Sequence, residues 1–510
     1  MTPLNFSAVN FAWLPILPLI AVAVGGMVVL LAGVRIDDED SAGVGFLTLV
    51  TLLAALLLTL FTLGQNNSAF SGSLVTDDYS AFFEILIIVA TAITVAMSLE
   101  YVAGSGLAGA EYYALILFAA LGMMLMAAAG DLIIIFLGLE TMSIAVYALA
   151  GFVRRDPKSN EAAVKYFLLG AFSTGFLLYG IALIYGATGT IRLEAIRAAL
   201  ATRAFYDPFL LLGLGMMLIG FGFKVAAVPF HMWTPDAYEG APTPVTAFMA
   251  VGVKLAAFAG FIRIFLVHLA PVSGHWTMAL WVIAAITMTT GNVVALVQSN
   301  IKRMLAYSAI AHAGYILVGM AAASTPEAGS AILYYLLAYS FTNLGAFAVV
   351  VALQRGREPH DLIADYRGLA RDHPGLAAAM ALFLLSLTGV PPLAGFFGKF
   401  YIFSAALNAG LVWLVIIAVI NSVISAYYYI GVIVAMYMQE GGVAVERMSS
   451  RPGVLISVAV SVAAVLIIGI YPQPYISAAV GAFASANGHP TLATTASAPS
   501  PALGVIGAER

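Results

Sequence analysis

Runs of apolar residues follow one another along almost the whole chain, separated by short polar segments. Each run is about 20 residues long, which is the length that a helix needs to cross the hydrocarbon core of a bilayer. Only 9% of the residues are charged, too few to cover so much apolar surface in a soluble protein. Because spanning segments must satisfy their own backbone hydrogen bonds, runs of this length indicate helices. The sequence therefore predicts an all-α polytopic membrane protein.

Hydropathy and helix-breaking residues predict fourteen spans. Lys and Arg are concentrated in the loops of one side, which marks that side as cytoplasmic, and Lys302 and Arg303 are among these loop charges. Both termini are then expected on the outer, periplasmic side, as an even number of spans requires. The spans are expected near residues 12–33, 45–64, 80–103, 112–129, 131–152, 163–186, 207–230, 243–269, 276–298, 302–322, 328–353, 375–406, 410–438 and 453–471.

Two segments, 207–238 and 375–406, are too long for single spans, and both are interrupted by Pro and Gly. Matching broken helices in two halves of a membrane protein point to inverted repeats, here spans 4–8 and 9–13 with discontinuous spans 7 and 12. The expected domains are an N-terminal three-helix segment, the two repeats, a last helix and a disordered tail rich in Ser, Thr, Ala and Pro. Their boundaries are 1–111, 112–270, 271–440, 441–485 and 486–510.

The first break carries charge into the membrane. Lys224 lies in an apolar run, Pro229 and further Pro and Gly residues interrupt it, and Lys254 lies well inside the apolar run that follows. A lysine at the bilayer centre costs about 2.5–3.5 kcal/mol on insertion scales. Broken backbone at that depth is tolerated only where protein or a wet cavity surrounds it. Buried lysines beside a broken helix predict an ion path.

Three more charges fall inside predicted spans: Glu140 midway along the fifth, Lys165 near the start of the sixth, and Lys399 just after the second break. We interpret Glu140 as the ion-pair partner of Lys224, although a hydrogen bond to a neighbouring helix is the alternative. Lys165 is close enough to the membrane surface for its ammonium to extend to the interface instead. With Lys254, these residues form a candidate lateral proton relay bridged by water.

The histidines and one further acid leave alternatives open. His231 lies in the first break, where it either links the relay to solvent or has a structural role in a loop. His312 shares a polar stripe with Ser308 and Tyr315, which suits core hydrogen bonding and proton relay equally. Glu84 lies about a turn inside the third span, and its role is open.

Several kinds of chemistry are excluded by missing residues and motifs. The chain has no cysteine, so thiol-ligated iron–sulfur or zinc sites, disulfides and thiol catalysis are excluded. It also lacks a P-loop, a Rossmann glycine fingerprint and a His-pair metal or haem signature. We therefore predict no cofactor or metal site in this chain and no nucleic-acid partner, and any redox chemistry must belong to partner proteins.

From the fourth to the thirteenth span, the chain resembles the antiporter-like membrane subunits of proton-pumping NADH:quinone oxidoreductase, respiratory complex I. Within that family it is most similar to the subunit N branch, also called subunit 2. The segment RRDPKSNEAAVKY, a lysine rather than a glutamate at Lys399, and the lack of a long C-terminal lateral helix support this branch. The motifs that carry the resemblance are GLETMSIAVYAL, RRDPKSNEAAVKYFLLGAFSTGFLLYG, FKVAAVPFHMWTPDAYEGAPTPVTAF, IKRMLAYSAIAHAGY and GVPPLAGFFGKFYIF.

The resemblance implies fourteen helices, two inverted five-helix repeats and a proton path through Glu140, Lys165, Lys224, Lys254 and Lys399. It also implies a translocase subunit of the bacterial inner membrane, with FMN, iron–sulfur clusters and quinone on partner subunits. The expected partners are membrane lipids and other membrane-arm subunits, including a neighbouring antiporter-like subunit and small quinone-proximal subunits.

Three other functions remain open on the sequence. The first is a self-contained cation/proton antiporter, although the chain offers no separate carboxylate-rich Na⁺ site. The second is the equivalent subunit of a photosynthetic complex I-like enzyme. The third is a structural membrane scaffold, in which Lys224→Ala would disturb assembly and leave pumping per electron unchanged.

Overall fold

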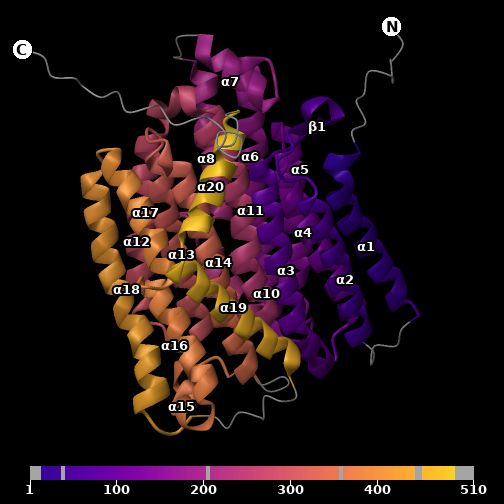
Figure 1. Cartoon of the computed structure of the whole chain (residues 1–510), viewed down its shortest axis with the longest axis vertical. Coiled ribbons are helices and arrows are strands. Elements are labelled where there is room, and N and C mark those ends of the chain that lie inside the picture. Colours follow the sequence, from indigo (N-terminus) through magenta and orange to yellow (C-terminus); the bar gives the residue numbers. More distant parts are fainter. Residues whose placement is uncertain (1–12, 36–40, 203–206, 355–359, 443–450, 489–510) are drawn as a thin grey trace, which may run out of the picture.

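The computed structural model describes residues 13–35, 41–202, 207–354, 360–442 and 451–488. These residues are almost entirely helical and form an elongated bundle of helices (Figure 1). The exception is one antiparallel ribbon of two strands, β1 (Asn67–Ala69) and β2 (Leu74–Thr76). The predicted disordered tail lies outside the described residues from position 489 onward.

Twelve helices in the described part of the chain are long and apolar enough to cross a membrane. Two shorter apolar helices, α8 (Pro208–Lys224) and α16 (Pro374–Thr388), accompany them. The polytopic all-helical fold is therefore confirmed, whereas the count of fourteen and the two-repeat layout stay predictions. The twelve are α1 (Leu17–Gly33), α2 (Ser41–Leu60), α3 (Asp78–Ser105), α4 (Gly109–Ala127), α5 (Leu132–Ala150), α6 (Pro157–Thr188), a run from α10 (Thr243–Phe248) through α11 (Lys254–Ile262) to His268, α12 (Thr277–Ala295), α13 (Ile301–Ala321), α14 (Glu327–Leu353), α18 (Val412–Met438) and α19 (Pro452–Ile470).

The remaining helices are short. They are α7 (Leu193–Thr202), α9 (Trp233–Gly240), α15 (Leu369–Asp372), α17 (Ala394–Asn408) and α20 (Gln473–Ala486). Of these, α7 coincides with the amphipathic stretch after the sixth predicted span, and it lies at one end of the bundle in Figure 1.

Both predicted helix interruptions are present. The first separates α8, which ends at Lys224, from α9, and Pro229 lies in the turn between them. The second separates α16 from α17, where Pro391 and Pro392 have no N–H to continue a helix. Gly389 ends α16 with φ +94°, a left-handed conformation that glycine adopts without steric penalty.

The predicted last span at 453–471 coincides with α19, but a further helix follows it. After α19 the helix ends at Tyr471 and the chain continues as α20, which was not predicted (Figure 1, yellow). The two helices together run antiparallel to the whole of α3. At one end the Gly453 N–H donates to Glu100 at 2.8 Å, and at the other the Asp78 N–H donates to Ser485 Oγ at 3.2 Å.

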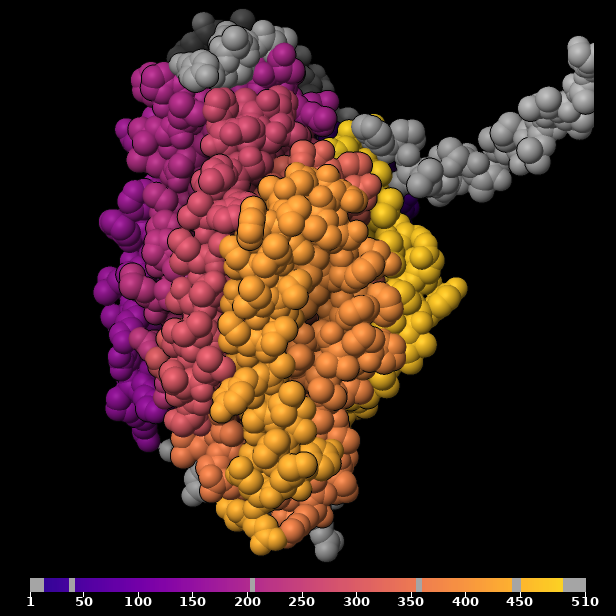
Figure 2. Space-filling model, turned by 90° about the vertical axis from the view of Figure 1, so that its left-hand side faces the viewer, coloured from indigo at the N-terminus to yellow at the C-terminus, as the bar shows by residue number. Residues whose placement is uncertain are grey.

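Burial is uneven across the bundle. The run from Thr243 to Val267 is wholly buried within the chain, and α13 and α14 are almost as well covered. By contrast α1, α2, α12 and α18 bury well under half of their apolar stretch, and Figure 2 shows α18 on the surface of one face. The fold therefore encloses its central helices in an outer ring, and the lysine-bearing segment around Lys254 is central.

Candidate functional site

Lys224 is enclosed at the end of α8, where only 2% of the residue is exposed. Its Nζ donates to Ser143 Oγ at 2.7 Å and to the Tyr147 hydroxyl at 3.1 Å, and both partners belong to α5. The ammonium also lies 5.2 Å from the ring centre of Tyr147 and 5.7 Å from that of Tyr166. Cation–π contacts of this kind stabilise a desolvated ammonium without neutralising it.

The predicted ion pair between Glu140 and Lys224 is not formed in this structure. Glu140 Oε1 has no hydrogen-bond partner among the described residues, and Lys224 contacts Ser143, about one turn further along α5. Glu140 instead shares a flank of α5 with Leu137 and Ile144, which are 49% and 62% exposed. Its Oε1 atom is nevertheless buried, and the buried Ser143 lies about one turn away on α5, so Glu140 lies at the boundary between the interior and the exposed surface of the chain.

Lys165 lies in a polar cluster near the membrane surface rather than in the interior. Its side chain is 43% exposed and forms ion pairs of 2.6 Å with Glu161 and with Asp236. This geometry matches the alternative in which the ammonium extends to the interface. The structure does not bring Lys165 into contact with the buried lysines.

Lys254 and Lys399 are both buried, with 3% and 5% of each residue exposed. Lys254 Nζ donates to the Ala309 carbonyl at 2.5 Å and to the Tyr339 hydroxyl at 3.4 Å. It begins α11 between two π-helical segments, a type of irregularity that is frequent at functional sites. Lys399 Nζ donates to the Thr388 carbonyl at 2.9 Å, at the end of α16.

Lys399 is also held from α18. Its Nζ donates to Ser422 Oγ at 2.8 Å, and it lies 4.8 Å from the ring centre of Tyr315 on α13. Within the described residues, no ion pair joins Lys224, Lys254 or Lys399 to a carboxylate. All three buried lysines are therefore solvated by hydroxyl groups, carbonyl groups and aromatic rings.

His312 connects the surroundings of two of these lysines. Its Nδ1 lies 2.5 Å from the Tyr335 hydroxyl and its Nε2 lies 3.3 Å from the Tyr429 hydroxyl. Its ring centre is 5.4 Å from that of Tyr339, which contacts Lys254, and 5.6 Å from that of Tyr315, over which Lys399 lies. A continuous cluster of titratable and hydroxyl groups thus extends from Lys254 to Lys399.

His231 is partly exposed in the turn between α8 and α9. Its Nδ1 is buried and has no hydrogen-bond partner in the described part of the chain. Its proposed link between the relay and solvent stays a prediction. No group of three or more His, Cys, Asp or Glu residues is placed to hold a metal ion within the described ranges.

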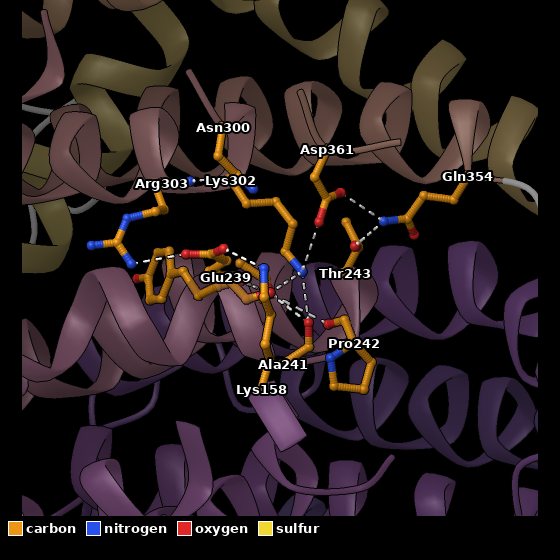
Figure 3. A network of polar contacts seen from close by, with 12 residues as sticks. Lys158, Glu239, Ala241, Pro242, Thr243, Asn300, Lys302, Arg303, Gln354 and Asp361 are labelled. Atoms are coloured by element: carbon orange, nitrogen blue, oxygen red, sulfur yellow. Dashed lines mark hydrogen bonds and ion pairs between the residues drawn. The ribbon is translucent and has the colours of Figure 1, made fainter. Parts of the chain in front are cut away.

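A charged network that the sequence did not reveal lies around α9 (Figure 3). Arg303 Nη1 lies 2.8 Å from Asp236 Oδ1 and 2.8 Å from Glu239 Oε2. Lys158 Nζ lies 2.9 Å from Glu239 Oε1, and a polar cavity of about 160 Å³ opens between these groups. The partners come from α6, α9 and α13, so no local sequence pattern signals them.

The two acids of this network stay ionised at neutral pH. Burial raises the pKa of Asp236, but hydrogen bonds from Lys165 and Arg303 outweigh burial, so that the pKa falls below its usual value. The pKa of Glu239 is lowered in the same way, against burial, by hydrogen bonds from Lys158 and Arg303. The cavity is therefore lined by fixed charges of both signs.

A buried ion pair that is separate from the α9 network lies near the start of α3. The Arg263 guanidinium donates to both Asp77 oxygens at 2.9 Å, and its Cζ lies 4.6 Å from the ring centre of Tyr79. Arg263 is only 3% exposed. Glu84 is also buried and accepts a hydrogen bond from Thr59 Oγ1 at 3.2 Å.

Comparison with known proteins identifies relatives over most of the chain. Residues 129–425 match the family described as "NADH:quinone oxidoreductase/Mrp antiporter, TM". NADH-quinone oxidoreductase subunit N of Trichlorobacter lovleyi is 50% identical over 460 residues, covering 90% of this chain and 94% of the relative. Subunit N of Moorella thermoacetica is 43% identical, covering 88% and 94%.

Solved structures agree with these relatives. A chain of respiratory complex I from Thermus thermophilus with bound aureothin superposes with a TM-score of 0.76 at 36% identity, over 90% of this chain and 98% of that one. A chain of the Mrp complex from Dietzia sp. shares the fold, with a TM-score of 0.76 at 23% identity, covering 93% and 97%. The resemblance predicted from the motifs is confirmed. The chain belongs to the NADH:quinone oxidoreductase/Mrp antiporter family of membrane proteins, and its curated relatives are subunit N of NADH-quinone oxidoreductase.

Proposed function

We propose that this chain is a proton-translocating membrane-arm subunit of bacterial NADH:quinone oxidoreductase. Quinone reduction in other subunits drives proton transfer along Lys224, Lys254, His312 and Lys399. The observation that carries the proposal is the environment of the three lysines: each is buried, and each is held by hydroxyl and carbonyl groups rather than by a carboxylate.

These environments accept a lysine with or without its extra proton. A carboxylate would hold the ammonium form, whereas a hydroxyl group accepts a hydrogen bond from an ammonium and donates one to a neutral amine. Ser143 and Tyr147 can accept or donate a hydrogen bond in this way at Lys224, and Ser422 can do so at Lys399. A modest rearrangement is therefore enough to load or unload each site.

The size of the required change can be bounded. Moving one charge across the membrane costs about 2.3 kcal/mol for each 100 mV of membrane potential. A tenfold change in proton affinity corresponds to about 1.4 kcal/mol. The rearrangement that quinone reduction causes must therefore change the proton affinity of a relay group by more than tenfold.

A polar cavity lies beside α9, the helix that follows Lys224. The cavity lined by Lys158, Glu161, Asp236, Glu239 and Arg303 lies on the side assigned to the cytoplasm, and it offers a route for proton uptake. Lys165, which pairs with Asp236, belongs to this route rather than to the buried part.

On α5, about one turn from the contact with Lys224, Glu140 is only partly exposed, and its Oε1 atom is buried without a partner in the described chain. We place its partner on an adjacent membrane-arm subunit. The relay then continues from subunit to subunit through groups that no single chain contains.

The same proposal includes fourteen spans in two five-helix repeats, with both termini on the outer side. The shorter helices α8 and α16 complete the count of the twelve long ones. In each repeat the fourth member is then the interrupted helix. Lys224 and Lys399 occupy different places in these interrupted helices, because Lys224 ends the helix before the first break and Lys399 follows the second break.

Transport measurements on the complex and on the isolated chain test the proposal. Reconstituted complex should acidify the outer compartment during NADH oxidation by quinone, and the isolated chain in liposomes should exchange no protons under an imposed Na⁺ gradient. Rapid Na⁺-driven proton exchange by the isolated chain would establish the self-contained antiporter instead. Reduction of quinone by reduced ferredoxin but not by NADH would assign the photosynthetic type of complex.

A further inference from the structure

Lys302 is a buried cation that the relay does not use. The sequence assigned it to a basic loop, whereas the structure places it as the second residue of α13 with its side chain only 4% exposed. The positive end of a helix dipole disfavours a cation at this position, and burial of an ammonium is costly in itself. A lysine kept in such a place requires strong compensating contacts.

These contacts are backbone carbonyls at the end of α9 (Figure 3). Lys302 Nζ donates to the Glu239 carbonyl and to the Ala241 carbonyl, both at 2.8 Å. The last carbonyl groups of a helix receive no hydrogen bond from an N–H group of the same helix. Pro242 has no N–H, so the chain cannot continue α9 into α10 as one helix. Lys302 therefore caps α9 from a different helix.

The same joint is held from a second side. Asp361 Oδ2 lies 3.9 Å from Lys302 Nζ, and its Oδ1 accepts a hydrogen bond from Gln354 Nε2 at 3.2 Å. Gln354 Nε2 also donates at 2.6 Å to Thr243 Oγ1, at the first residue of α10. The Ile301 N–H donates to the Asp361 carbonyl at 2.7 Å, which ties this acid to the start of α13.

The joint matters because α9 connects the two lysine-bearing helices of the first break. At the start of α9, Trp233 Nε1 donates at 3.0 Å to the Phe223 carbonyl, next to Lys224. At its end, the joint leads through α10 and a π-helical segment to Lys254. A short rigid helix fixed at both ends sets the separation of Lys224 and Lys254.

We propose that Lys302 is a positioning residue of the proton path: its ammonium, with Asp361 as counterion, closes the joint between α9 and α10 and so fixes Lys224 relative to Lys254. Lys302 carries no proton of the relay itself. This inference rests on the proposed function, since it assigns a role to a residue that acts through the relay.

The test compares Lys302→Met with Lys302→Arg in the assembled complex, in membrane vesicles. Loss of the ammonium in Lys302→Met should lower protons pumped per electron at least twofold, at an unchanged pH optimum, because the carbonyls lose their donor. Lys302→Arg retains donors and charge and should recover more than half of the loss. Arg371→Met is the matched control and should pump normally. It also removes a cation, but the side chain of Arg371 is 70% exposed and pairs with Glu440 at the surface.

Parental pumping by Lys302→Met overturns the inference. A shifted pH optimum in Lys302→Met that Lys302→Arg does not restore also overturns it, because such a shift identifies Lys302 as a proton carrier. Lys302→Gln, which keeps an amide donor without charge, replaces the Met variant if the latter fails to assemble. Its pumping should fall between the parental value and zero, and a parental value counts against the inference. Normal pumping by Lys224→Ala would refute the relay, whereas loss there with parental pumping by Lys302→Met would refute only the role of Lys302.

Discussion

At the scale of single residues, one buried amide in the interior lacks hydrogen-bond partners in the described chain. Asn343 is fully buried on α14, and neither its Nδ2 nor its Oδ1 has a hydrogen-bond partner in the described chain. It lies one helical turn from Tyr339, the residue that contacts Lys254. An unsatisfied buried group of this kind costs about 1–3 kcal/mol.

We therefore expect Asn343→Leu, which removes both polar atoms at similar volume, to raise stability by about 1 kcal/mol. The measurement is the thermal unfolding midpoint of the isolated chain in detergent. Ser340→Ala is the matched control, because Ser340 Oγ donates to the Leu336 carbonyl at 2.6 Å and its loss should bring no gain. A clear loss of stability in Asn343→Leu would show that the amide is hydrogen-bonded after all.

The residue scale also shows where sequence reasoning ends. Lys224, Lys254 and Lys399 could be predicted to be buried because they lie inside apolar runs. A charged residue within a membrane-spanning run almost always faces the interior of the bundle. The contacts of Lys224 were not predictable in the same way. Glu140 and Ser143 are three residues apart on α5, and only the rotation of that helix decides which of them meets the lysine.

At the scale of elements, the interrupted helices meet one another. A Cβ on Gly469 of α19 would lie 2.3 Å from the Pro392 carbonyl oxygen and 2.6 Å from Ala394 N, in the break between α16 and α17. The neighbouring Ile468 carbonyl accepts a hydrogen bond from the Tyr334 hydroxyl at 3.1 Å. The helix α19 therefore packs directly on the turn that precedes Lys399.

Gly469→Ala should force that turn to move. Overpacking of a tight interior contact costs about 1–3 kcal/mol, so the variant should unfold at lower temperature than the parent. Because α17 begins at the displaced turn, protons pumped per electron should also fall. The assembled complex provides both measurements, by thermal unfolding and by vesicle acidification.

Gly481→Ala in α20 is the matched control for this substitution. Its added Cβ would meet nothing within 4 Å, so helix propensity alone should leave stability unchanged or raise it by about 0.5–1 kcal/mol. If Gly469→Ala behaves like Gly481→Ala, the contact between the two breaks has no mechanical importance.

Elements were predictable where one local signal decides them. Prolines revealed both interruptions, since a residue without an N–H cannot continue a helix. The additional helix α20 was missed because residues 473–486 are rich in Ala and Ser and do not resemble membrane-spanning sequence. The network of Asp236 and Glu239 was missed because its partners lie on helices remote in sequence.

At the scale of the whole molecule, the orientation determines the direction of proton uptake. The cavity beside Asp236 must face the cytoplasm if it takes up protons there. The chain contains no cysteine, so single cysteines report the side of the membrane without background. Ala201 on α7 and Ala364, five residues before α15, are both exposed. The helices α7 and α15 lie at opposite ends of the bundle (Figure 1).

A membrane-impermeant maleimide should label Ala201→Cys in right-side-out vesicles and should leave Ala364→Cys unlabelled until the vesicles are opened. The basic loops predict this outcome, because Lys and Arg are retained on the cytoplasmic side. The reverse labelling pattern would invert the orientation and place the polar cavity on the outer side.

The central claim is that Lys224 belongs to a coupled proton path, and protons pumped per electron in vesicles carrying Lys224→Ala test it most directly. Complex assembly is checked in parallel, and Arg371→Met controls for the loss of a cation. We predict normal assembly with a collapse of both quinone-linked activity and pumping, because the hydroxyl and aromatic groups that contact Lys224 cannot replace its ammonium. Normal assembly with an unchanged proton-to-electron ratio would contradict the account and leave the buried lysine a purely structural role.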